Sequence, residues 1–94
     1  MTSLAFTHHA TQRCNQRGIS VEDIDFILTH GSLYHHQGCE IVSIDKKDVK
    51  FLMNEPSVNR QLLFRAMGKY VVLNNETVIT VAHRLEKFKQ DYWN

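Results

Sequence analysis

The stretch His9-Ala-Thr-Gln-Arg13-Cys-Asn-Gln-Arg17-Gly18-Ile19-Ser20 decides the start of the fold, because it combines the end of one helix with the beginning of another. Gly18 suits the left-handed position that ends a helix, and Ser20 suits the cap of the next helix. We expect the first helix to begin at Thr7 or His8. The stretch therefore predicts a helical hairpin with a very short connection.

Downstream, turn residues divide the chain into strands and further helices. The expected elements are the rest of the second helix to Gly31, strands at 33–36 and 40–44 around Gln37-Gly38, a helix capped by Asp45, a helix from Ser57 to Gly68, and strands at 70–73 and 77–83 around Asn74-Asn75. Strand is an alternative after Ser57 and around Phe51. The pattern predicts an α+β fold in which the helical hairpin and further helices pack on a small antiparallel sheet.

Length and composition indicate one globular domain, residues 1–94, because 94 residues with 43% hydrophobic content can bury a single modest core. The net charge of +1 gives no bulk attraction to nucleic acid, so anion binding would need a local site. Cys14 and Cys39 are too few for a disulfide scaffold, which favours a reduced, cytoplasmic location. The sequence has neither a signal peptide pattern nor an apolar run that could cross a bilayer, so no membrane association is expected.

Three cationic or basic side chains follow one another at helical spacing near the N-terminus. His9, Arg13 and Arg17 are four residues apart and fall within one narrow arc of a helix face. Like charges at this spacing repel by a few tenths of a kcal/mol, so an anion should face them, either a carboxylate or a ligand phosphate. An alternative is a solvated helix face with intrachain ion pairs.

The three side chains are expected at the margin of the core. Phe6, Ala10 and Cys14 project within a similar arc. Arginine stems can cover apolar surface while their guanidinium groups stay free, so buried structural arginines are the specific alternative to a ligand site.

Six histidines raise the question of a metal site. Adjacent histidines diverge by about 100° on a helix and point to opposite faces of a strand. Neither His8-His9 nor His35-His36 is therefore a natural chelate, and we expect no metal and no other cofactor.

Two motifs together resemble a widespread bacterial domain family of unknown function. They are the run from His9 to Ser20 and the late strand Val78-Ile-Thr-Val81. The resemblance covers essentially the whole chain in the order of its elements, with Cys14 where the family usually has an apolar residue such as Met. It implies the fold of the barnase, EndoU, colicin and RelE ribonucleases, in which N-terminal helices pack on an antiparallel sheet. The ending Val81-Ala-His83-Arg84 also resembles the late strand of RelE-like toxins.

Metal-free RNA cleavage needs a base for the ribose 2′-hydroxyl, cations for the transition state and an acid for the leaving oxygen. In a RelE-like ribonuclease His9 would be the acid or base, and Thr80 would orient the substrate. Arg13, Arg17 and Arg84 would bind phosphate. Thr80 and Arg84 have the same strand parity, so a pocket between their face and the first helix would gather all five groups.

Each of these residues also has a structural interpretation. The hydroxyl of Thr80 could bind a neighbouring backbone group, and a neutral His9 could hold the helix to the sheet. His83 would point to the other face unless a bulge intervenes.

Three functions fit the sequence. The first is a metal-independent toxin ribonuclease of a toxin–antitoxin system, with RNA as substrate and a protein antitoxin or immunity protein as partner. The second is a non-catalytic module that binds a phosphate, a nucleotide or an acidic protein. The third is a structural interaction domain in which Glu22, Asp23 or Asp25 neutralises the cations.

Overall fold

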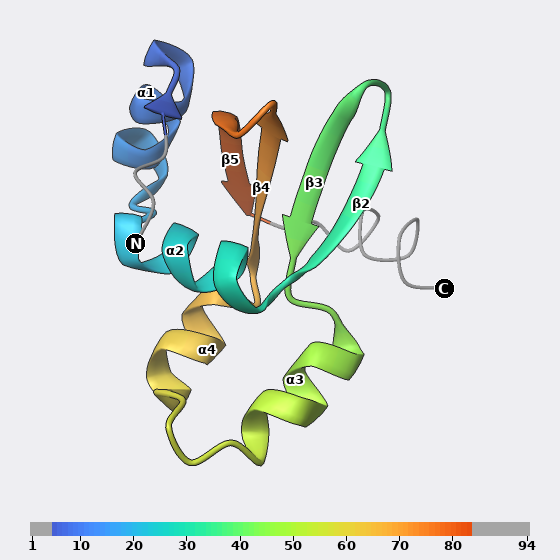
Figure 1. Cartoon of the computed structure of the whole chain (residues 1–94). Coiled ribbons are helices and arrows are strands. Elements are labelled where there is room, and N and C mark those ends of the chain that lie inside the picture. The colour runs from blue at the N-terminus through green and yellow to red at the C-terminus, as the bar shows by residue number, and fades with distance from the viewer. Residues whose placement is uncertain (1–4, 84–94) are drawn as a thin grey trace.

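Residues 5–83, which the computed structural model describes, form four helices and a five-stranded mixed sheet (Figure 1). The helices are α1 (His8–Arg17), α2 (Val21–His30), α3 (Lys46–Met53) and α4 (Arg60–Ala66). The strands are β1 (Ala5–Phe6), β2 (Ser32–His36), β3 (Cys39–Ser43), β4 (Lys69–Asn74) and β5 (Thr77–His83). The predicted α+β class is confirmed.

The strands lie in the order β1-β5-β4-β3-β2. Neighbouring strands from β2 to β5 are antiparallel, whereas β1 runs parallel to β5 and pairs Ala5 with Thr77 and Phe6 with Val78. The sheet is therefore mixed rather than purely antiparallel. β1 could not be predicted from the sequence, because a strand of two residues has no periodicity of its own.

The helix ends follow the predicted capping residues. Thr7 caps α1 and Gly18 ends it with a φ of 64°, while Ser20 caps α2. Asp45 caps α3 in a capping box with Asp48. These predictions are confirmed, and the short connection between α1 and α2 follows from them.

Several predicted boundaries shift, and two of them change the start of a helix and the position of a turn. The fourth helix begins at Arg60 after an Asn59 cap, three residues later than the expected start at Ser57. The hairpin turn between β4 and β5 lies at Asn75 and Glu76, whose φ values are 50° and 67°, one residue after the predicted Asn74-Asn75.

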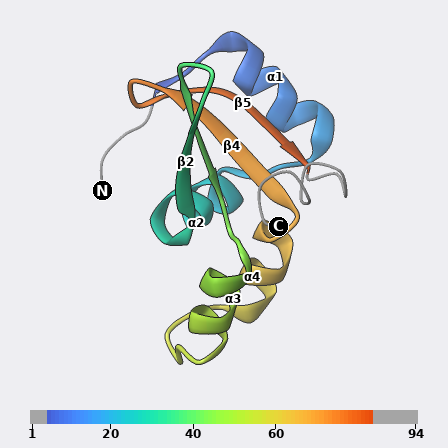
Figure 2. The same cartoon turned by 90° about the vertical axis from the view of Figure 1, so that its right-hand side faces the viewer.

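The core lies between one face of the sheet and the helices. Ala10 of α1 and Ile24 and Ile27 of α2 belong to one buried cluster with sheet residues that include Val71 and Val81. Both views show α3 and α4 beyond one end of the sheet (Figures 1 and 2). They join the same core through buried side chains, Leu52 on α3 and Leu63 and Ala66 on α4.

A β-bulge in the middle of β5 changes which face of the sheet each following residue points to. Val78 pairs with Leu73 and Thr80 pairs with Val72, so Ile79 is the extra residue. Val78 and Val81 consequently face the same core although they are three residues apart, and their side chains are 0% and 1% exposed. The bulge reverses the faces that simple alternation would assign to the residues after it.

None of the helices within residues 5–83 is long and apolar enough to cross a membrane.

Candidate functional site

The side chains of His9, Arg13 and Arg17 form a row on α1, which we call the α1 stripe. Ala10 is fully buried on the neighbouring side of the helix, whereas His9 and Arg17 are exposed and Arg13 is half-buried. The row therefore lies at the margin of the core, as the residue pattern predicts.

Thr7 fixes the start of α1 against β5. Its backbone N–H donates to the carbonyl of Val78 at 3.0 Å, and its hydroxyl donates to the carbonyl of the bulge residue Ile79 at 3.4 Å. The same hydroxyl oxygen accepts the N–H of Ala10 at 3.1 Å. The helix that carries the α1 stripe is thus anchored to the sheet at its first turn.

Two members of the α1 stripe contact each other directly. The Nε–H of Arg13 donates to Nε2 of His9 at 3.3 Å. Nε2 of His9 is the acceptor in this bond, and the Arg13 guanidinium is the donor. The bond orients the Arg13 guanidinium on the helix surface and does not use its two Nη groups.

Asp23, one of the acidic residues that could neutralise the α1 stripe, is bound to other cations. Asp23 is 2% exposed, and its Oδ1 accepts from Nε and Nη2 of Arg65 at 3.2 and 3.0 Å. Nζ of Lys69 lies 3.4 Å from Oδ2. Within residues 5–83, neither arginine of the α1 stripe forms an ion pair with a carboxylate. Neutralisation of the stripe by Glu22, Asp23 or Asp25, as the structural-domain hypothesis required, is therefore not observed.

Arg17 marks the junction between the end of α1 and the end of β5. Nε2 of His83 lies 3.2 Å from the backbone carbonyl oxygen of Arg17, so the imidazole N–H donates to a carbonyl at the helix C-terminus. The bulge in β5 places His83 on the α1 side of the sheet. His83 therefore ties α1 to the sheet, and the guanidinium of Arg17 is not part of that bond.

Thr80 does not join the α1 stripe. It lies between Ile79 and Val81 and pairs with Val72, whereas the next pair, Val81 with Val71, belongs to the core under the helices. Successive residues point to opposite faces, so Thr80 lies on the face away from α1. The predicted pocket between Thr80 and α1 is therefore wrong. Arg84 lies outside the described residues.

Cys14 follows Arg13 on α1 and is half-buried. Burial raises the pKa of the Cys14 thiol, which favours the protonated, unreactive form. Among the described residues, no three His, Cys, Asp or Glu side chains gather where they could hold a metal ion.

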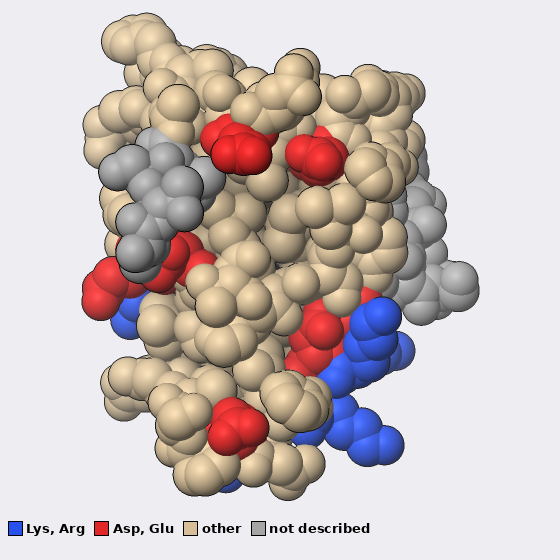
Figure 3. Space-filling view, viewed as in Figure 1, with Lys and Arg blue, Asp and Glu red and all other residues tan. Residues whose placement is uncertain are grey.

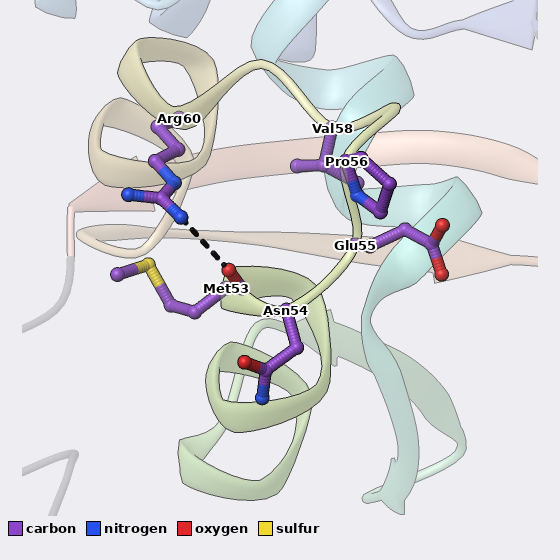
Figure 4. A pocket seen from close by; sticks show the side chains of 6 residues that line it. All are labelled: Met53, Asn54, Glu55, Pro56, Val58 and Arg60. Carbon is purple, nitrogen blue, oxygen red and sulfur yellow. Dashed lines mark hydrogen bonds between the residues drawn. The ribbon is translucent and has the colours of Figure 1, made fainter.

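A hollow of about 390 Å³ lies where the chain leaves α3 and enters α4 (Figure 4). Met53, Asn54, Glu55, Pro56, Val58 and Arg60 line it. Nη2 of Arg60 donates to the carbonyl oxygen of Met53 at 3.1 Å, so this guanidinium satisfies the C-terminal end of α3. None of the predicted site residues lines this hollow.

A polar network at the start of α3 was not predicted from the sequence. The hydroxyl of Tyr34 donates to Oδ2 of Asp45, and that of Ser32 donates to Oδ2 of Asp48 at 2.7 Å. The spacing of the two aspartates indicates a capping box, but nothing local indicates the two hydroxyl groups from β2.

The α1 stripe therefore places three of the five predicted residues in one row on a helix anchored to the sheet, with the Arg13 guanidinium hydrogen-bonded to His9. Comparisons with protein-family models, curated proteins and solved structures found no match.

Proposed function

We propose that the protein binds phosphate groups of RNA through the α1 stripe. The observation that supports this most directly is the hydrogen bond from Arg13 to His9, which orients a guanidinium on the helix surface while its two Nη groups remain for a ligand. Paired Nη donors match two phosphate oxygens, which makes arginine suited to phosphate recognition.

Electrostatics favours a ligand at this position. Arg13 and Arg17 are one helical turn apart, so their charges raise the free energy of the empty face by a few tenths of a kcal/mol. A bound phosphate relieves that repulsion. The buried carboxylate of Asp23 does not compete for this role, because Arg65 and Lys69 hold it.

Thermal unfolding with and without sulfate tests the site, since sulfate is a stand-in for phosphate. At ten times its dissociation constant, sulfate should stabilise the wild type by about 1.4 kcal/mol. That corresponds to a rise in Tm of about 6–11 °C. Arg13→Gln should lose this specific rise, because the oriented donor is gone.

Arg60→Gln is the matched control, because the Arg60 guanidinium is already bonded to the Met53 carbonyl. The control should keep the full wild-type response to sulfate, including the general stabilisation that sulfate gives by exclusion from protein surfaces. Equal responses in the wild type and both variants would refute the α1 site.

A labelled RNA strand extends the test from the anion to the polymer. Each lost phosphate contact lowers the dependence of log K on log salt by about 0.7 for single strands. We expect that decrease in Arg13→Gln and in Arg17→Gln. An unchanged affinity and slope in both variants would limit the site to small anions.

A second candidate is metal-independent RNA cleavage at the same place, which the position of the His9 Nε2 beside the Arg13 guanidinium favours. Nε2 of His9 would take the proton of a ribose 2′-hydroxyl, whose oxygen then bonds to phosphorus while the bond to the 5′-oxygen breaks and that oxygen takes a proton from water. Arg13 would have to leave Nε2 and move to the phosphate, where its charge would stabilise the transition state. Thr80 takes no part, since it lies on the other face.

Incubation with labelled RNA in a chelator separates cleavage from binding. A ribonuclease should produce 2′,3′-cyclic phosphate ends, and His9→Ala should slow cleavage by about 100-fold or more while the protein stays folded. Expression of the wild type in bacteria should then arrest growth, and a protein antitoxin or immunity partner would need to cover α1. If the RNA stays intact at all time points, cleavage is refuted, and phosphate binding is the only function still proposed for the α1 stripe.

Both candidates place the protein in the cytoplasm, where RNA is available.

A further inference from the structure

The carboxylates at the start of α3 point toward the protein, whereas the lysines of this helix point outward. Asp45 and Asp48 are turned inward, where they accept from the hydroxyl groups of β2 and from each other's backbone N–H. Leu52 is buried in the core, and Val49 and Met53 pack against it. The side chains that remain on the outside are Lys46, Lys47, Lys50 and Phe51, which we call the α3 patch.

The α3 patch combines three ammonium groups with an exposed ring. Phe51 is 67% exposed, and all three lysines are exposed. None of the three ammonium groups forms a hydrogen bond or an ion pair within residues 5–83. Figure 3 shows Lys and Arg side chains gathered over α3 at the lower right, and none over α1 in this view. The α3 patch is thus a basic surface separate from the α1 stripe.

The placement of the lysines works against the stability of the helix itself. Lys46 and Lys47 are in the first turn of α3, where the helix dipole disfavours cations. An exposed phenylalanine likewise gains nothing from burial. A ligand that is anionic and also presents a flat apolar face would satisfy both features at once.

A comparison with α4 shows what distinguishes the α3 patch. Phe64 on α4 is 55% exposed and also has two arginines near it in sequence. Arg60, however, is bonded to the Met53 carbonyl, and Arg65 is bonded to Asp23. The cations beside Phe64 are therefore held by hydrogen bonds within the protein, whereas those beside Phe51 form no hydrogen bond or ion pair among residues 5–83, and Lys47 acts on Asp45 only through its charge.

We propose that the α3 patch binds single-stranded nucleic acid, with one base stacked on the ring of Phe51 and the neighbouring phosphates on Lys46, Lys47 and Lys50. Aromatic rings beside cationic side chains are the usual means of holding unpaired bases and their backbone. A duplex would not fit, because its base faces are covered by stacking. The site goes beyond the α1 stripe and does not depend on it.

A membrane surface is a poorer match to the same residues. An amphipathic helix that lies on a bilayer inserts a broad apolar face. The apolar side of α3 is turned into the protein core, and only the ring of Phe51 remains outside.

Fluorescence anisotropy with three labelled probes tests the proposal: an oligouridylate, an abasic strand of equal length and a duplex. We expect the oligouridylate to bind more tightly than the abasic strand. Phe51→Leu should weaken oligouridylate binding by about 5- to 150-fold, the effect of losing one stacked base, and should leave the abasic strand unaffected. Phe51→Tyr should retain wild-type affinity, and Phe64→Leu is the matched control that should change nothing.

The lysines are tested by salt dependence. Replacing Lys46, Lys47 and Lys50 with glutamine should lower the slope of log K against log salt by about 2, because three single-strand phosphate contacts are lost. Thermal unfolding checks that every variant is folded.

The outcomes separate this site from the α1 stripe. If Phe51→Leu binds the oligouridylate as the wild type does, the α3 proposal is overturned, whatever Arg13→Gln shows. If Phe51→Leu weakens binding while Arg13→Gln and Arg17→Gln do not, the α3 site stands and the α1 stripe does not bind RNA. A loss of binding to phosphatidylserine vesicles or to polyglutamate in Phe51→Leu, with nucleic-acid binding unchanged, also overturns the proposal.

Discussion

Replacing Asp23 with Asn should strongly destabilise the fold, because it removes the charge that holds two cations. The Asp23 side chain is 3% exposed, and it bridges Arg65 on α4 and Lys69 at the start of β4. Nζ of Lys69 also donates to the carbonyl oxygen of Arg65 at 2.7 Å. The variant therefore disturbs the contact between α2, α4 and the sheet.

Arg65 and Lys69 differ in how well water can solvate them once the Asp23 charge is removed, and that difference determines the expected loss of stability. The side chain of Arg65 is 52% exposed and can turn to water, whereas that of Lys69 is only 10% exposed. Breaking a buried pair by removal of one partner costs about 3–5 kcal/mol. Since only Lys69 is left buried, we expect about 3 kcal/mol, the lower end of that range. For a chain of this size the corresponding fall in Tm is about 12–24 °C.

Urea and thermal unfolding at neutral pH measure this loss. Arg65→Gln is the first control, and it should cost less, because Lys69 still neutralises Asp23. The double variant Asp23→Leu/Lys69→Met is the second control, since replacing a buried ion pair by apolar groups is often neutral. It should recover most of the stability that Asp23→Asn loses.

The pH dependence gives an independent check. Burial raises the pKa of the Asp23 carboxyl, but the hydrogen bond from Arg65 and the charge of Lys69 outweigh burial, and the net pKa is lowered. Such a carboxyl contributes stability that is complete above its unfolded-state pKa of about 3.9 and is lost as the pH falls through the folded-state value. The difference between wild type and Asp23→Asn should therefore be constant from neutral pH to about pH 5 and shrink below about pH 4. A difference under about 1 kcal/mol at neutral pH, or one that persists undiminished in acid, would refute this reasoning.

Further predictions concern backbone geometry and the cap of α3, and thermal unfolding measures all of them. Gly31→Ala should cost about 2 kcal/mol, because the added Cβ would lie 2.6 and 2.8 Å from carbonyl oxygens of α2 and β3; an unchanged Tm would mean that these backbones separate freely. Gly18→Ala has open space but a φ of 64°, so strain of about 1 kcal/mol is expected, and a larger loss would contradict this. Asp45→Ala should cost about 1–2 kcal/mol through loss of the cap, whereas Asp48→Asn should cost less, since burial and the nearby Asp45 raise the pKa of Asp48 and disfavour its charge. Equal losses in these two variants would count against this account of the cap.

The helical part of the fold could be predicted because its signals are local. Thr7, Gly18, Ser20 and Asp45 each act on backbone groups within one helical turn, and a short window of sequence contains all the information needed. The same holds for the α1 stripe, whose three members share a face through helical periodicity alone.

Features that depend on distant partners could not be predicted in this way. The face on which Thr80 lies depends on the bulge at Ile79, and the bulge is defined only by pairing with β4. The sequence offers Asp23 as a partner of the α1 cations, yet Arg65, which binds it, is 42 residues away in the sequence. No local window contains both halves of such a contact.

The pairing of β1 and α1 with β5 also determines when the N-terminal segment can find its place. Thr7 and its partner Ile79 are 72 residues apart, and closing a loop of that length costs about 4 kcal/mol of chain entropy. During synthesis, α1 cannot pack on the sheet until β5 has left the ribosome. The helix that carries the cations therefore docks late, after the β2–β3 and β4–β5 hairpins can form from neighbouring residues.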